Sequence, residues 1–70
     1  MNKVSDFEFQ QKERLIVEQE IKYWAGRFKK VDSPALKREI PIRVKDIINS
    51  YETQIPAFNY HMARYERLIR

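Results

Sequence analysis

Apolar side chains recur at alternating spacings of four and three residues through the second half of this chain, and this pattern constrains the fold most. The series is Val44, Ile48, Tyr51, Ile55, Phe58, Met62, Tyr65 and Ile69. Such a heptad pattern is typical of helices that bury one seam against a partner helix. A series with matching spacing occupies the first half: Phe7, Gln10, Arg14, Val17, Ile21, Trp24, Phe28 and Val31. The sequence therefore predicts two long helices packed along these seams.

The first of these helices is predicted over residues 5–30. Ser5 and Glu8 have the spacing of a capping box, and no proline interrupts the residues that follow. Gly26 lies inside the helix, where glycine costs about 1 kcal/mol relative to alanine. We therefore expect either a weak point or a close approach of another element at this position.

Prolines set the boundaries in the second half. A Ser-Pro pair predicts a short connecting helix over residues 34–39, which Pro41 ends because the residue before a proline avoids helical backbone. A long helix is then expected over residues 41–68, bent at Pro56, because the apolar seam continues in register across that proline. The alternative is a break near Gln54.

Folding the two long helices back on each other brings their seams into contact, so that Val31 meets Val44 and Trp24 meets Tyr51. One Gly and no Cys among 70 residues argue against a β-rich or disulfide-bonded domain. The predicted fold is all-α. It is a single small helical domain over residues 1–70, built as an antiparallel helical hairpin whose second long helix is kinked, with a short connecting helix.

A second pattern lies one residue before each seam. It recurs every seven residues, as Phe9, Ile16 and Tyr23 in the first half and as Ile47, Gln54, His61 and Leu68 in the second. In an antiparallel pair both stripes open onto one face, which two helices leave uncovered. The opposite face is expected to be solvated and holds Glu18, Ala25, Lys29, Lys45, Asn49, Glu52, Asn59 and Glu66.

An uncovered apolar strip is typical of a contact with another protein, although small domains also expose some apolar surface without a partner. The predicted protein interface consists of Phe9, Ile16, Tyr23, Ile47, His61 and Leu68. Glu13, Glu20 and Arg27 border this strip and would make such an interface partly polar.

Catalysis has little support in the sequence. His61 is the only histidine, and Glu13 and Glu20 come close to it in the predicted hairpin. The paired Glu-x-x-His motifs of di-iron bundles are missing, and one Gly excludes a glycine-rich phosphate loop. We therefore predict a non-enzymatic protein with no catalytic residue, no metal site and no cofactor.

Nucleic-acid binding is the alternative function, since the net charge of +4 at pH 7 suits an anionic partner. A strand over residues 38–44 followed by two helices resembles a ribbon-helix-helix repressor, and helices around Ile47 and Phe58 joined by a turn at residues 54–56 resemble a helix-turn-helix. The candidate contacts are Tyr60, Arg64, Arg67 and Arg70. Charges of both signs are mixed along the chain without a basic run, however, which favours a protein partner over nucleic acid.

No stretch approaches the roughly 18 apolar residues of a membrane span, and no signal-peptide core is present. The absence of Cys fits a reducing compartment, so an intracellular location, in the cytoplasm or an organelle interior, is expected. The sequence thus predicts a small basic accessory or adaptor subunit of a larger assembly, or a homodimer.

Overall fold

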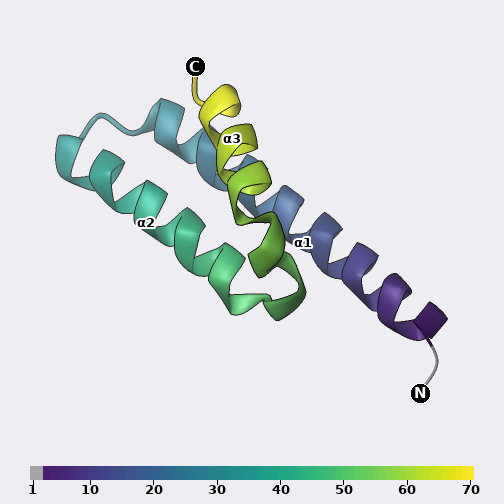
Figure 1. Cartoon of the computed structure of the whole chain (residues 1–70). Coiled ribbons are helices and arrows are strands. Elements are labelled where there is room, and N and C mark those ends of the chain that lie inside the picture. The colour runs from purple at the N-terminus through teal and green to yellow at the C-terminus, as the bar shows by residue number, and fades with distance from the viewer. Residues whose placement is uncertain (1–2) are drawn as a thin grey trace.

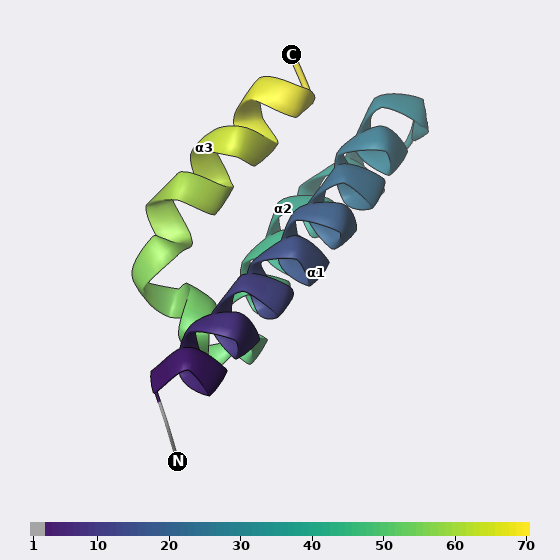
Figure 2. The same ribbon diagram turned by 90° about the vertical axis from the view of Figure 1, so that its right-hand side faces the viewer.

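The computed structural model describes residues 3–70 of the chain, with side chains from Asp6 onward. Its elements are α1 (Lys3–Lys30), α2 (Pro34–Ser50), the 3₁₀ helix η1 (Glu52–Ala57) and α3 (Phe58–Leu68). α1 and α2 run antiparallel, η1 turns the chain, and α3 returns in the general direction of α1 (Figure 1, Figure 2). Over the described residues, the predicted all-α class is confirmed as three packed helices.

The connection between α1 and α2 is short because both helix ends are well marked. Cationic side chains in the last turn of α1, including Arg27 and Lys30, favour the negative end of the helix dipole. Ser33 caps α2, since its Oγ accepts a hydrogen bond from the backbone nitrogen of Leu36 at 3.4 Å, and Pro34 follows at the first helical position. α1 begins at Lys3, and the capping contact expected of Ser5 falls outside the described side chains.

The predicted short helix over 34–39 is wrong, because α2 continues through Pro41 to Ser50. Pro41 cannot donate to the carbonyl of Lys37, a loss of about 3 kcal/mol in a helix interior. Packing of the surrounding turns outweighs this cost. The three apolar residues spaced four apart around the proline are all buried: Ile40, Val44 and Ile48.

The long kinked helix over 41–68 is also absent from the structure. α2 ends at Ser50, Tyr51 has extended backbone with φ −111° and ψ 97°, and a new helix begins only at Phe58. The alternative break near Gln54 lies inside η1. Turning the chain here lets α3 bury side chains against both α1 and α2, which a continuous two-helix pair does not allow.

A three-residue connection over 31–33 also shifts the register between α1 and α2. Trp24 lies against Arg43 rather than against the predicted Tyr51. Because the turn is centred several residues earlier than in the predicted hairpin, each residue of α1 that contacts α2 faces an earlier residue of it than predicted.

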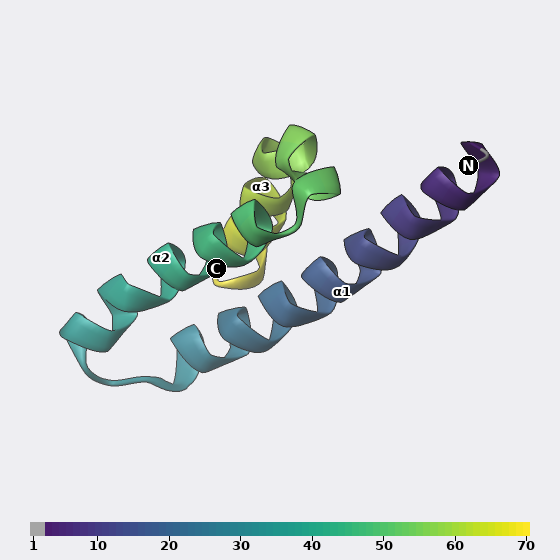
Figure 3. The ribbon, with the colours of Figure 1, turned by 90° about the horizontal axis from the view of Figure 1, so that it is seen from below.

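The core takes residues from all three α-helices: Val17, Ile21, Ala25, Ile40, Val44, Ile48 and Tyr65. Ala25, predicted to be solvated, is buried, and the ring of Tyr65 meets that of Phe28 edge-on at 6.3 Å. Phe7 and Ile55, predicted in the seam, are exposed instead. The first turns of α1 extend past η1 without a neighbouring element, in a molecule of 48 × 16 × 15 Å (Figure 3).

Candidate functional site

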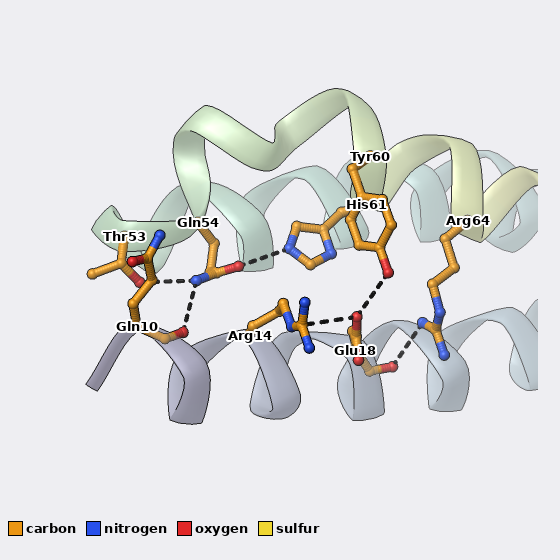
Figure 4. A network of polar contacts seen from close by, with 8 residues as sticks. All are labelled: Gln10, Arg14, Glu18, Thr53, Gln54, Tyr60, His61 and Arg64. Carbon is orange, nitrogen blue, oxygen red and sulfur yellow. Dashed lines mark hydrogen bonds and ion pairs between the residues drawn. The ribbon is translucent and has the colours of Figure 1, made fainter. Parts of the chain in front are cut away.

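A chain of polar contacts joins η1 and α3 to α1 (Figure 4). Gln54 is 2% exposed and His61 is fully buried. The amide nitrogen of Gln54 donates to the carbonyl oxygen of Gln10 at 3.1 Å and to Oγ1 of Thr53 at 3.0 Å. Thr53 in turn donates to Oε1 of Glu13 at 2.7 Å. These bonds attach η1 to α1 and so hold the turn that returns α3.

The amide of Gln54 also sets the tautomer of His61. Because its nitrogen donates, its Oε1 accepts a hydrogen bond from the N–H at Nε2 of His61, at 3.0 Å. Nε2 therefore carries a proton, and the burial of Nδ1 without a partner among the described residues favours the neutral ring. Burial is the main cause that lowers the pKa of His61. The carboxylate of Glu18 opposes this shift, and Arg64 and Arg14 add to it.

Glu18 holds α3 against α1. Its Oε2 accepts a hydrogen bond from the hydroxyl of Tyr60 at 3.0 Å, and its carbonyl oxygen accepts one from Nη1 of Arg64 at 3.2 Å. Two of the four residues predicted to contact nucleic acid are therefore engaged within the chain. The other two are exposed at the end of the chain: Arg67 and Arg70.

The structure separates the groups considered for acid–base or metal chemistry. Glu13 accepts a hydrogen bond from Thr53, whereas Glu20 accepts one from the hydroxyl of Tyr51 at 3.2 Å, which raises the pKa of that tyrosine. His61 is bonded elsewhere, to the η1 amide. Within the described part of the chain, no group of three or more His, Asp or Glu side chains could hold a metal ion.

Three of the six predicted interface residues follow one stripe of α1. Phe9, Ile16 and Tyr23 are 55%, 45% and 56% exposed. Ile47 is half-buried on α2. The remaining two do not join this stripe, because α3 folds back over another side of α1: the predicted surface residue His61 lies in the interior, and Leu68 packs partly buried against the core.

Two sides of α1 have different neighbours. Glu18 contacts α3, and Ile16 is two residues away, or about 200° around an α-helix, so Ile16 lies on nearly the opposite side. Tyr23 is one turn from Glu20, which binds Tyr51 at the end of α2. The stripe therefore borders the α1–α2 contact on the side away from α3.

A hollow of about 240 Å³ lies between the C-terminal half of α1 and the N-terminal half of α2. The Cζ atoms of Arg27 and Arg43 each lie 5.9 Å from the centroid of the Trp24 ring, within cation–π range. Nη1 of Arg27 also donates to the hydroxyl of Tyr23 at 3.2 Å. The hollow is lined by Trp24, Arg27, Val31, Leu36, Glu39, Ile40 and Arg43.

The hollow adjoins the exposed stripe of α1, because Trp24 in its lining follows Tyr23 of the stripe. On α2, Leu36 and Ile47 lie two turns before and one turn after Arg43, so the three share one side of the helix. We call the combined surface the hairpin face, formed by Ile16, Tyr23, Trp24, Leu36, Arg43 and Ile47.

Sequence reasoning did not find the cluster at Trp24. The spacing of Trp24 and Arg27, three residues apart on one helix, is a signal for a local cation–π pair. The second cation, Arg43, comes from α2, and its place depends on the register that the predicted hairpin had wrong.

The chain matches no protein-family model, no curated protein and no solved structure, so its function must be argued from its own residues. None of the described helices combines the length and the apolar character needed to cross a membrane.

Proposed function

We propose that this chain is a helical protein–protein interaction module rather than an enzyme, acting as a small accessory or adaptor subunit of a larger assembly or as a homodimer. One observation carries the proposal: the hairpin face is uncovered while α3 occupies another side of α1. On it, Ile16, Tyr23 and Leu36 are each between 45% and 56% exposed. Apolar surface gathered on one side of a small domain is typical of a docking surface. An intracellular location belongs to the same proposal and rests on the absence of Cys.

The residue types of this surface suit a protein interface. Tyr, Trp and Arg are the residue types enriched where proteins meet, and all three occur here. Tyr23 and Trp24 contact each other edge-on, with ring centroids 5.2 Å apart. Arg27 lies beside both rings, which holds these large side chains in fixed positions before a partner arrives.

The test is native mass determination of complexes captured with the tagged full chain from cells that carry the gene. Ile16→Glu places a charge on the hairpin face, and we expect it to abolish the captured complex or the dimer mass. Ile42→Glu is the matched control, because Ile42 is 55% exposed on the side of α2 opposite its buried neighbours. A wild-type chain that is monomeric and alone, or a complex that survives Ile16→Glu, contradicts the proposal.

Nucleic-acid binding is kept as a second candidate function, and it is favoured by Arg67 and Arg70, which stay exposed at the end of α3. The ribbon-helix-helix resemblance loses its basis, because residues 38–44 belong to α2 and form no strand. Binding of a random duplex DNA that weakens steeply with added salt would favour this second function.

A further inference from the structure

The residues that line the hollow at Trp24 indicate which kind of partner it binds. We infer that it binds an acidic segment of a partner protein, in which a carboxylate lies next to a large apolar side chain. This inference rests on the proposed interaction function and names the kind of partner. The apolar side chain would enter the hollow, and the carboxylate would pair with Arg27 and Arg43.

The size and lining of the hollow fit one apolar side chain. Val31, Leu36 and Ile40 line it together with the ring of Trp24. Its volume, about 240 Å³, is below the roughly 300–1,000 Å³ typical of sites for whole small molecules. The hollow therefore suits an anchor residue of a longer segment that continues over the hairpin face.

The cations of the hollow have unused hydrogen-bonding capacity. Among the described side chains the one ion pair is Arg14 with Glu18, so neither Arg27 nor Arg43 has a carboxylate within 4.0 Å. Glu39 also lines the hollow, one turn from Arg43, without pairing at that distance. Each guanidinium has five N–H donors in a planar fork that matches a carboxylate. A partner carboxylate could therefore pair with two guanidinium groups, and Glu39 is the one acidic residue of the lining that would compete with it.

The same cluster is a poor platform for a nucleobase. A base stacks on an aromatic face that is free to receive it. Two guanidinium groups already lie over the ring of Trp24, and the ring of Tyr23 meets it edge-on. We therefore favour a peptide partner over a nucleic acid at this site.

Positive charge is concentrated at the end of the molecule that holds the hollow. Residues 21–45 and 64–70 hold eleven Lys and Arg against three Asp and Glu, whereas residues 6–20 and 46–63 hold two against seven. The connection between α1 and α2 and the end of α3 lie at the same end of the molecule (Figure 2). This end attracts an acidic partner and would speed its association at low salt.

The test starts from a random twelve-residue peptide library displayed on phage and selected on the full-length protein. The selection uses the wild-type protein alone, so that the arginine variants remain an independent test of the enriched peptides. We expect the enriched peptides to carry Asp or Glu beside Leu or Phe. Trp24 is the only tryptophan of the chain, so its emission and its protection from acrylamide report occupancy of the hollow by a Trp-free peptide.

The affinity of an enriched peptide should fall about tenfold or more in Arg27→Ala/Arg43→Ala, as expected when a guanidinium anchor is removed. Arg38→Ala/Arg67→Ala is the matched control, because it removes equal charge from exposed positions outside the hollow. We expect it to change the affinity less than about twofold at physiological salt, where exposed charges are screened. Helical circular dichroism must be unchanged in both variants.

Three outcomes would overturn the inference: enriched peptides without acidic residues, equal binding to both double variants, or no enrichment. Binding that is lost in Ile16→Glu but kept in Arg27→Ala/Arg43→Ala would leave the interaction function standing and remove only this partner chemistry. A random duplex DNA that displaces the peptide with the same arginine dependence would assign the hollow to nucleic acid instead.

Discussion

A neutral imidazole is held inside this fold by a single hydrogen bond. Nε2 of His61 donates to Gln54, and Nδ1 has no partner among the described residues. A protonated ring would bring a charge and a second donor, at Nδ1, into this interior, and that donor has no acceptor among the described residues. Glu18 is the nearby carboxylate that favours the charged form, and its Oε2 already accepts from Tyr60.

The free energy of unfolding should therefore depend on pH through His61. Its pKa in the folded chain lies below the unfolded value of about 6.5, so the unfolded chain takes up the proton first. The stability contributed by the neutral ring is complete above about pH 6.5 and is lost as the pH falls through that value toward the folded pKa. Urea titrations should show the free energy of unfolding falling between about pH 7.5 and pH 5.5.

His61→Gln is the control for this experiment, since glutamine keeps a donor for Gln54 but does not titrate. Its free energy of unfolding should be lower at neutral pH and should change less over the same interval. If wild type and variant lose stability in parallel, other groups cause the pH dependence and the imidazole is not excluded from charging.

Among the helix boundaries, the sequence correctly predicted those that are marked by a capping residue. α1 ends at Lys30 and α2 begins at Pro34, as the Ser-Pro pair predicts. The prolines did not predict the other helix boundaries, because the effect of a proline on a helix depends on which side chains the adjoining turns bury. Ile40 and Val44 on either side of Pro41 are in the core, so the helix continues, whereas it ends at Ser50 with no proline at all.

The part of the candidate site that lies on α1 alone was predictable from the sequence. Phe9, Ile16 and Tyr23 share a stripe of α1 because a period of seven residues needs no knowledge of other elements. Assigning His61 required the position of α3, and assigning Arg43 to Trp24 required the α1–α2 register. Both follow from long-range packing that periodicity does not encode.

Pro41→Ala distinguishes a continuous α2 from two shorter helices. In the continuous helix, alanine restores the hydrogen bond to the carbonyl of Lys37, a gain of about 3 kcal/mol. The more flexible unfolded chain offsets about 0.4–1 kcal/mol, leaving roughly 2 kcal/mol of net stabilisation. For a domain of this size that corresponds to a rise in Tm of roughly 10 °C by calorimetry. A proline at the first position of a separate helix is favourable, so an unchanged or lower Tm would support the two-helix reading.

For the whole molecule, the two ends differ in charge, because residues 21–45 alone hold eight Lys and Arg against two Asp and Glu. Within α1 the five acidic residues all precede Ile21, whereas residues 21–30 hold four cations and no acid. α3 adds its arginines to the positive end, where α1 and α2 connect (Figure 2). The position of α3 thus strengthens this separation of charge and decides which side of α1 stays uncovered.

The return of α3 can be tested with pairs of nitroxide labels, since the chain has no cysteine of its own. Lys29 and Arg67 lie in the last turns of α1 and α3, at one end of the molecule, and the rings of Phe28 and Tyr65 are 6.3 Å apart there. Glu8 lies about 30 Å away along α1 at about 1.5 Å per residue. Electron double resonance should therefore give a shorter distance for Lys29→Cys/Arg67→Cys than for Glu8→Cys/Arg67→Cys. A continuous 41–68 helix packed on its seam would place Arg67 beside Glu8 and invert this order, so the sign of the difference alone decides between the two folds.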